Sequence, residues 1–216
     1  MEHTMFSDLV TFYQSGGIFM HPILLAFAFG IAIAIERYIY LSVLKMNNRR
    51  LLGKIMPLLK QGNYQEVYQI TSRSSNVAIC QMLNLGLSTM QSSSRREDIE
   101  MAMEEELMEI IPRLEKRTHY LAMLANISTL LGLLGTIQGL IQAFNSVAAV
   151  DPSLKAEILS SSISVAMNTT AFGLCSAIPL IIIFSILQAK TTEIVDSLEM
   201  ATVKFVNLIH KKKQQA

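Results

Sequence analysis

The amino-acid sequence predicts an all-α integral membrane protein with three transmembrane helices. Of its 216 residues, 51% are hydrophobic and only 16% are charged, a balance outside that of ordinary soluble domains. The apolar residues gather in three runs, 16–35, 119–150 and 158–189, which contain no aspartate, glutamate, lysine or arginine. About 20 apolar residues, at a rise of 1.5 Å each, cross a hydrocarbon core of roughly 30 Å. Each run is therefore long enough to span a membrane once.

The distribution of lysine and arginine predicts the orientation of the spans. None precedes the first span, eleven lie between Lys45 and Arg117, one lies between the second and third spans, and five follow from Lys190 onward. The positive-inside rule therefore places the N-terminus outside and the 43–118 segment inside. The first run ends at Glu36-Arg37 without a cleavage site, so we expect it to be retained as a span. The expected segments are an outer segment 1–17, a span 18–42, an inner helical region 43–118, a span 119–145, an outer loop 146–159, a span 160–189, and an inner helix with a basic tail 190–216.

The inner segments are expected to be helical. Residues 51–72 predict two short amphipathic helices around Gly62-Asn63, and Ser94 with Glu97 has the spacing of a capping box. From there a helical pattern runs into the second span without a stop signal, with Pro112 as a candidate kink. Apolar residues at helical spacing continue from Ile194 to Ile209. The second and third spans should therefore extend as long helices on the inner side.

Small residues form a stripe on each of the last two spans. Intervals of three, four or seven residues place such residues on one face of a helix, where they let helix backbones approach closely in lipid. We expect the two spans to pack on each other or on copies of themselves, with Pro179 as a candidate kink in the third. The packing residues are Gly132, Gly135 and Gly139 in the second span, and Gly173 and Ala177 in the third.

Three polar side chains, Asn168, Thr169 and Thr170, stand together inside the uncharged third span. A lone threonine can bond back to the carbonyl four residues earlier, which leaves a purely local explanation open for each hydroxyl. An asparagine amide has four hydrogen-bonding sites and cannot satisfy them all on its own helix. Together with Thr136 in the second span, these residues are interpreted as the lining of a polar path or as the binding site for a partner's polar group.

The sequence offers no support for catalysis, a cofactor, a metal or nucleic-acid binding. The four histidines and two cysteines are scattered without ligand spacing, and no cluster of basic residues alternates with aromatic ones. We therefore expect a protein that is not an enzyme. The spans also lack a central aspartate, glutamate, lysine or arginine, whereas ion passage through hydrocarbon usually requires an ionisable or coordinating group there. If ions pass, a partner is expected to supply that group.

Three motifs together resemble the MotA/TolQ/ExbB proton-channel family, most closely its three-span ExbB/TolQ type. "GGIFMHPILLAFAFGIAIAIER" (16–37) is similar to the first span of ExbB-type proteins. "LLGLLGTIQGLIQAF" (130–144) and "TTAFGLCSAIP" (169–179) resemble the signatures of the second and third spans. The resemblance covers about three-fifths of the chain, whereas residues 46–95 match only in general character.

The resemblance implies a subunit of an ion-driven motor in the bacterial inner membrane, with a periplasmic N-terminus and a cytoplasmic C-terminus. Five such subunits would surround two single-span helices of an ExbD/TolR/MotB-like partner, whose membrane aspartate carries a proton. A TonB/TolA-like protein that spans the periplasm is a further implied partner. By motif, Thr170 corresponds to the threonine near that aspartate, and Thr136 to the threonine beside it.

One departure from the family keeps alternatives open. ExbB and TolQ members usually carry a glutamate five residues before the third-span threonine, whereas this chain has Val165. The Thr169-Thr170 pair is similar to that of sodium-driven flagellar relatives, and neutral oxygens suit sodium. Sodium is therefore the alternative ion, although flagellar members have four spans. A scaffold of the same fold that conducts nothing is the alternative favoured by Val165.

Overall fold

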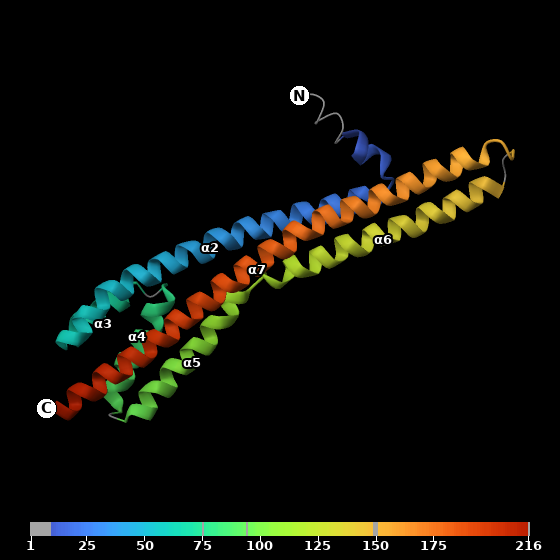
Figure 1. The fold of residues 1–216 in the computed structure, drawn as a ribbon. Coiled ribbons are helices and arrows are strands. Elements are labelled where there is room, and N and C mark those ends of the chain that lie inside the picture. Colours follow the sequence, from blue (N-terminus) through green and yellow to red (C-terminus); the bar gives the residue numbers. More distant parts are fainter. Residues whose placement is uncertain (1–9, 75, 94, 149–150, 216) are drawn as a thin grey trace. The chain divides into compact units, whose positions relative to one another are not determined.

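The computed structural model describes residues 10–74, 76–93, 95–148 and 151–215, with side chains up to Lys211. Within these residues there are helices and no strands, so the predicted all-α class is confirmed (Figure 1). Residues 10–15 are helical and precede the first labelled helix. The labelled helices are α2 (Met20–Gln61), α3 (Tyr64–Arg73), α4 (Ala78–Ser92), α5 (Arg96–Glu115), α6 (His119–Ala148) and α7 (Lys155–Gln215).

Among the described residues, three helical stretches have the length and composition needed to cross a membrane. They lie within Met20–Gln61, Arg96–Ala148 and Lys155–Lys211, and they include residues 20–35, 119–148 and 158–189 of the predicted apolar runs. The third continues without interruption as α7, a helix of 61 residues. Ile194, Leu198 and Phe205 are buried along its second half, so the expected continuation of the apolar stripe beyond the third span is confirmed.

The first of the two short helices expected within 51–72 does not exist as a separate element. Helix α2 continues through this region to Gln61, because Ile55 and Leu59 extend its buried face and are almost fully covered. The helix ends at Gln61, and the next residue, Gly62, has a φ of +83°, in the left-handed region that glycine adopts without a steric penalty. The second expected helix is present as α3.

The expected uninterrupted helix from residue 96 into the second span is also wrong. Helix α5 ends at Glu115 and α6 begins at His119, with Arg117 between them at a φ of 65°. The buried guanidinium of Arg37 donates a hydrogen bond to the carbonyl of Leu114. In a continuous helix that carbonyl would accept from the N–H of Thr118. The positively charged guanidinium of Arg37, on α2, is therefore a hydrogen-bond donor to the Leu114 carbonyl near the end of α5.

The expected capping residue Ser94 lies outside the described residues. Its neighbour Ser93 accepts a hydrogen bond from the N–H of Arg95 at 3.2 Å and donates one to Asp98 at 2.5 Å. Glu97, the expected capping partner, instead lies 4.0 Å from the guanidinium of Arg95. These contacts organise the chain at the start of α5.

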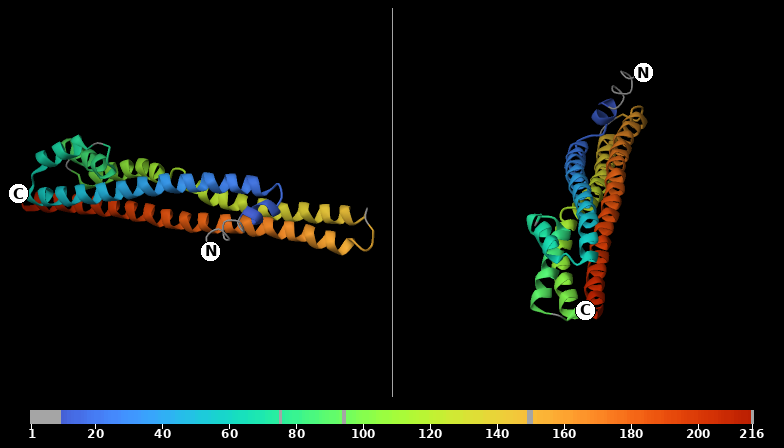
Figure 2. Two further views of the ribbon diagram at one scale, coloured as in Figure 1. Left: turned by 90° about the horizontal axis from the view of Figure 1, so that it is seen from above. Right: turned by 90° about the vertical axis from the view of Figure 1, so that its left-hand side faces the viewer.

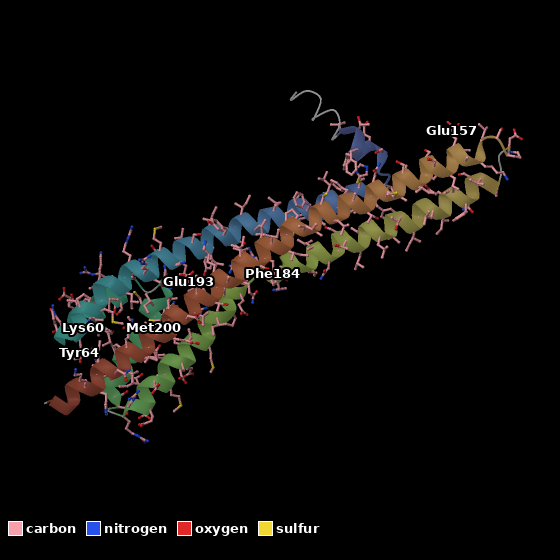
Figure 3. All side chains as sticks on the ribbon, in the orientation of Figure 1. Lys60, Tyr64, Glu157, Phe184, Glu193 and Met200 are labelled. Carbon is pink, nitrogen blue, oxygen red and sulfur yellow. The ribbon has the colours of Figure 1, made fainter. Side chains whose placement is uncertain are left out.

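The described residues fall into two compact units. Unit 1 holds those up to Ile35 and those from Arg117 to Ser185, and unit 2 holds those from Glu36 to Lys116 and from Ile186 onward. In unit 1, α6 and α7 run side by side with the first part of α2 (Figure 2). In unit 2, Gly86 of α4 lies against Met103 of α5 and Phe205 of α7, within a core of buried aliphatic side chains.

Replacing Arg37 with methionine is expected to destabilise unit 2 by about 1–3 kcal/mol, because it leaves a buried carbonyl without its donor. The measurement is the unfolding free energy of the detergent-solubilised protein, followed by circular dichroism. Lys204→Met is the control, since Lys204 is exposed on α7 and such a change usually costs less than about 0.5 kcal/mol. Equal stability of the two variants would contradict this role for Arg37.

Cys80 is expected to resist thiol reagents while unit 2 is folded. Its side chain is fully buried in α4, and burial raises the pKa of the thiol from 9.0 to about 11. The thiolate is the reactive form, so at pH 8 both access and ionisation are suppressed. Because the folded-state pKa is raised, the thiol's contribution to stability is present below pH 9 and is lost as the pH rises toward 11.

The measurement is the rate of maleimide labelling at pH 8, read by mass spectrometry in a Cys175→Ala background so that Cys80 is the sole thiol. The denatured protein supplies the reference rate. Labelling of the folded protein at the denatured rate would contradict the prediction.

Candidate functional site

The two stripes of small residues meet in unit 1, where the backbones of α6 and α7 lie in contact. A Cβ added to Gly173 would lie 2.7 Å from the carbonyl oxygen of Ser128 and 3.1 Å from the Cα of Gly132. A Cβ on Gly132 would lie 3.3 Å from the Cα of Thr170. These glycines therefore allow an approach that a larger residue would prevent. Further along the stripe, Gly139 faces Ala166 in the same manner, with a Cβ-to-Cβ distance of 2.8 Å if alanine stood there.

Thr170 joins the two helices across this contact. Its hydroxyl donates a hydrogen bond to the carbonyl of Gly132 at 3.0 Å, and its side chain is half-buried. A hydroxyl oxygen that donates its proton retains lone pairs and can still accept a hydrogen bond. The helix backbone therefore orients the Thr170 hydroxyl while its oxygen stays available to a further donor.

Thr169 is more deeply placed than its neighbour, with 2% of its surface exposed. Its hydroxyl lies within hydrogen-bonding distance of two carbonyls, that of Val165 on its own helix, at 3.0 Å, and that of Gly16. Its methyl group packs against Gly135 of α6, where a Cβ would collide with it. Thr169 thus contacts both α6 and the segment that precedes α2.

Asn168 is bound to the same N-terminal segment. Its amide nitrogen donates to the hydroxyl of Ser15 at 3.0 Å, and that hydroxyl donates to the carbonyl of Phe12 at 2.9 Å. The aromatic ring of Tyr13 lies edge-on to Phe172 of α7, with the ring centroids 5.9 Å apart. The helical residues 10–15 are therefore held against α7 by both polar and aromatic contacts.

Ser15 and Gly16 are site residues that the sequence analysis missed. The turn they begin depends on Gly17, whose φ of +77° is rarely adopted by other residues. The "SGG" sequence ahead of an apolar run is a turn signal, and a turn leaves polar backbone groups that need partners. That signal could have indicated a partner for the third-span polar residues, although not which one.

Thr136 and Val165 occupy different surroundings from the Asn168–Thr170 group. The hydroxyl of Thr136 donates to the carbonyl of Leu133 on its own helix, at 2.6 Å, and the side chain is half-buried. Among the described residues no hydrogen bond joins it to Thr170. A methyl of Val165 lies beside Gly17, at the turn before α2. Ala177 is buried on the stripe, and α7 continues as a helix through Pro179.

The polar group in unit 1 offers neutral oxygens and no charge. The helical residues 20–35, 119–148 and 158–185 contain no aspartate, glutamate, lysine or arginine. The described residues also contain no group of three histidine, cysteine or acidic side chains that could hold a metal. This arrangement can accept and donate hydrogen bonds, but it cannot itself take up a proton from an acid.

The three apolar helices, the close contact of α6 with α7 and the uncharged polar group define a multi-pass membrane protein. A model of the MotA/TolQ/ExbB proton channel family matches residues 74–200, which is more than half of the chain. The chain belongs to this family, as the three motifs predicted. The family is one of channels rather than of enzymes.

Individual relatives carry ExbB and TolQ names. The chain is 41% identical over 88 residues to "Biopolymer transport protein exbB1" of Vibrio cholerae, a match that covers 41% of this chain and 38% of that protein. It is 24% identical over 200 residues to a "Putative biopolymer transport protein ExbB homolog" of Methanothermobacter thermautotrophicus, covering 90% of the chain and 68% of the relative. The "Tol-Pal system protein TolQ" of Haemophilus influenzae is 28% identical over 101 residues, covering 47% of the chain and 44% of the relative.

Proposed function

We propose that this protein is the channel subunit of an inner-membrane motor driven by the ion-motive force. In this proposal five copies surround a dimer of a single-span, ExbD/TolR-like partner whose membrane aspartate carries the ion. The observation that carries the proposal is the oriented, uncharged polar group on the α6–α7 contact, set among helical residues 20–35, 119–148 and 158–185 that contain no aspartate, glutamate, lysine or arginine. Such a group needs a charged side chain from elsewhere in order to pass ions.

The four polar residues have distinct proposed roles along the ion path. Thr170 and Thr136 are half-buried and face the partner's carboxyl group, because each hydroxyl donates to a helix carbonyl and keeps its lone pairs free to accept. Asn168 lines the path beside them. Thr169 is buried and stabilises the lining of the path, because its hydroxyl contacts the Gly16 carbonyl and its methyl group packs against Gly135.

The transported ion is proposed to be a proton, taken up and released by the partner's aspartate. Movement of the ion down its gradient would displace one set of helices against the other and do mechanical work on a periplasmic or outer-membrane component. A TonB/TolA-like protein that spans the periplasm would receive that work. The positive-inside rule supports the orientation, with the N-terminus in the periplasm and unit 2 in the cytoplasm.

Sodium is the second candidate ion, and the neutral oxygens of Asn168, Thr169 and Thr170 favour it. A hard cation is coordinated by several such oxygens. The complex reconstituted in liposomes, with either a pH gradient or a sodium gradient imposed, distinguishes the two ions. Flux that follows the pH gradient in the complete absence of sodium would exclude sodium.

The competing function is a membrane scaffold that keeps the family fold and conducts nothing. The side chain of Val165, where relatives of the ExbB/TolQ type usually have a glutamate, favours it because an apolar group beside Gly17 cannot relay a proton. Capture of the complex from its own membranes, followed by native mass spectrometry, tests both readings. Five copies with two single-span chains that bear a membrane aspartate support the motor, whereas a partner without that aspartate supports the scaffold.

A further inference from the structure

Two helices of unit 2 present exposed stripes with the same spacing and opposite charge. In each stripe the members follow the first methionine at intervals of 3, 4, 7, 8 and 11 residues, which places them on one helix face. All of them are exposed. The basic stripe on α2 consists of Met46, Arg49, Arg50, Gly53, Lys54 and Pro57. The acidic stripe on α5 consists of Met101, Glu104, Glu105, Met108, Glu109 and Pro112.

Most of the charges of the two stripes have no ion-pair partner among the residues that the structure describes. After Glu36, helix α2 contains no acidic residue, so the basic stripe has no anion on its own helix. Among the described residues, the one ion pair that involves either stripe joins Glu109 to Arg113 at 3.7 Å. Both partners of this pair are largely exposed, and a pair of that kind on a helix surface contributes little. The remaining cations and carboxylates are free to bind another molecule.

The exposed methionines distinguish these stripes from ordinary solvated helix faces. Met46 is 54% exposed, Met101 is 63% exposed and Met108 is 70% exposed, each beside charged residues. Methionine is flexible and polarisable, and it is enriched at surfaces that bind other proteins. The combination of methionine with charge therefore favours a protein partner for both stripes.

The two stripes lie at matching levels along unit 2. Within unit 2, α2 begins at Glu36 and α5 ends at Glu115. The hydrogen bond from Arg37 to the Leu114 carbonyl places these two ends at the same height along the unit. Arg49 lies twelve residues beyond Arg37, and Glu104 lies ten residues before Leu114. At 1.5 Å per residue these positions are about 18 Å and about 15 Å from the anchor.

We propose that the acidic stripe of one copy binds the basic stripe of the next copy and forms an ionic contact between neighbouring subunits. Copies related by rotation about a common axis keep the same level, so Arg49 and Arg50 of one would meet Glu104 and Glu105 of the next. Because the two surfaces differ, each copy uses one stripe on each side and the contact can close into a ring. This inference rests on the oligomer in the proposed function, and it assigns the surfaces in unit 2 that hold that oligomer together.

Reversal of the charges on each stripe, separately and together, tests the contact. The variants are Arg49→Glu with Arg50→Glu, Glu104→Arg with Glu105→Arg, and the combination of all four changes in one chain. Each double reversal is expected to raise the protein concentration at which the oligomer half-dissociates by about tenfold, through the loss of attraction and the gain of like-charge repulsion. The combination is expected to restore assembly, because every copy again presents opposite charges to its neighbour.

Controls separate this effect from misfolding and from general charge effects. Lys204→Glu and Glu199→Lys reverse exposed charges on α7 of the same unit and should leave assembly unchanged. Protection of Cys80 from maleimide shows that unit 2 is folded in each variant. The oligomer is quantified by native mass spectrometry of the full-length complex over a dilution series, and raised salt should weaken the unaltered oligomer.

Several outcomes would overturn the ionic contact. These are unchanged assembly in either double reversal, or a combined variant that is weaker than both. Loss of assembly only with the basic reversal, together with loss of a phosphatidylglycerol-dependent increase in stability, would assign the basic stripe to anionic lipid instead. A single-copy unaltered protein would overturn the contact and the proposed function together. An oligomer that is weakened by each double reversal and restored by the combination, but passes no ions, would overturn the proposed function alone.

Discussion

Replacement of Gly173 with alanine is expected to force α6 away from α7 and to destabilise unit 1 by about 3 kcal/mol, at the upper end of the usual cost of overpacking. The added Cβ would lie 2.7 Å from a carbonyl oxygen and 3.1 Å from a Cα, and backbone atoms in helices cannot move aside as a side chain can. Gly132→Ala should cost less, since its closest contact would be 3.3 Å. The measurement is the unfolding free energy in detergent for each variant.

Gly53→Ala is the matched control for this prediction. Gly53 lies in the interior of α2, and a Cβ added there would meet no atom within 4 Å. Alanine is favoured over glycine in a helix interior by about 1 kcal/mol, so this variant should be slightly more stable than the unaltered protein. If Gly173→Ala behaved like Gly53→Ala, the close contact of α6 with α7 would be refuted.

Replacement of Thr170 with valine is expected to lower ion flux through the reconstituted complex by about two- to tenfold, the equivalent of one neutral hydrogen bond, that from the partner's protonated carboxyl group to the Thr170 oxygen. Valine has nearly the volume of threonine and removes one hydrogen bond between α6 and α7, a loss of about 1 kcal/mol, so the contact and the assembly should persist. The variant loses the hydroxyl that the Gly132 carbonyl orients toward the proposed position of the partner's carboxyl group. Flux is measured in liposomes, and assembly is measured on the same preparation by native mass spectrometry.

Thr129→Val separates this role from the general loss of a hydroxyl in a span. The hydroxyl of Thr129 bonds at 3.1 Å to the carbonyl of Ala125, four residues earlier on its own helix. This variant should retain both flux and assembly. Undiminished flux in Thr170→Val would remove Thr170 from the ion path, and equal losses in the two variants would indicate a nonspecific effect.

The sequence was sufficient to predict the features that depend on local composition. The three uncharged runs predicted the three apolar helices, since the length of a span follows directly from the thickness of hydrocarbon. The spacing of Gly132, Gly135 and Gly139 placed them on one face, and the structure sets that face against α7. Each of these inferences needed only the period of a helix and the size of a side chain.

Features that depend on contacts between distant residues could not be predicted in this way. The last turn of α5 is contacted by Arg37, which lies 77 residues before its partner Leu114, and no glycine marks the break. The partner of Asn168 is Ser15, 153 residues away. The polar character of Asn168 and its neighbours predicted that partners exist, whereas only the folded chain identifies them.

The aromatic contact between the N-terminal segment and α7 also makes the polar group accessible to optical spectroscopy. The chain contains no tryptophan, so Phe12→Trp would introduce its sole indole. The ring of Phe12 lies 6.4 Å from that of Phe172, and the Phe12 carbonyl accepts the hydrogen bond of the Ser15 hydroxyl that Asn168 binds. The emission of that single fluorophore would therefore report, in real time and without an added label, whether the Asn168 link stays closed while ions flow.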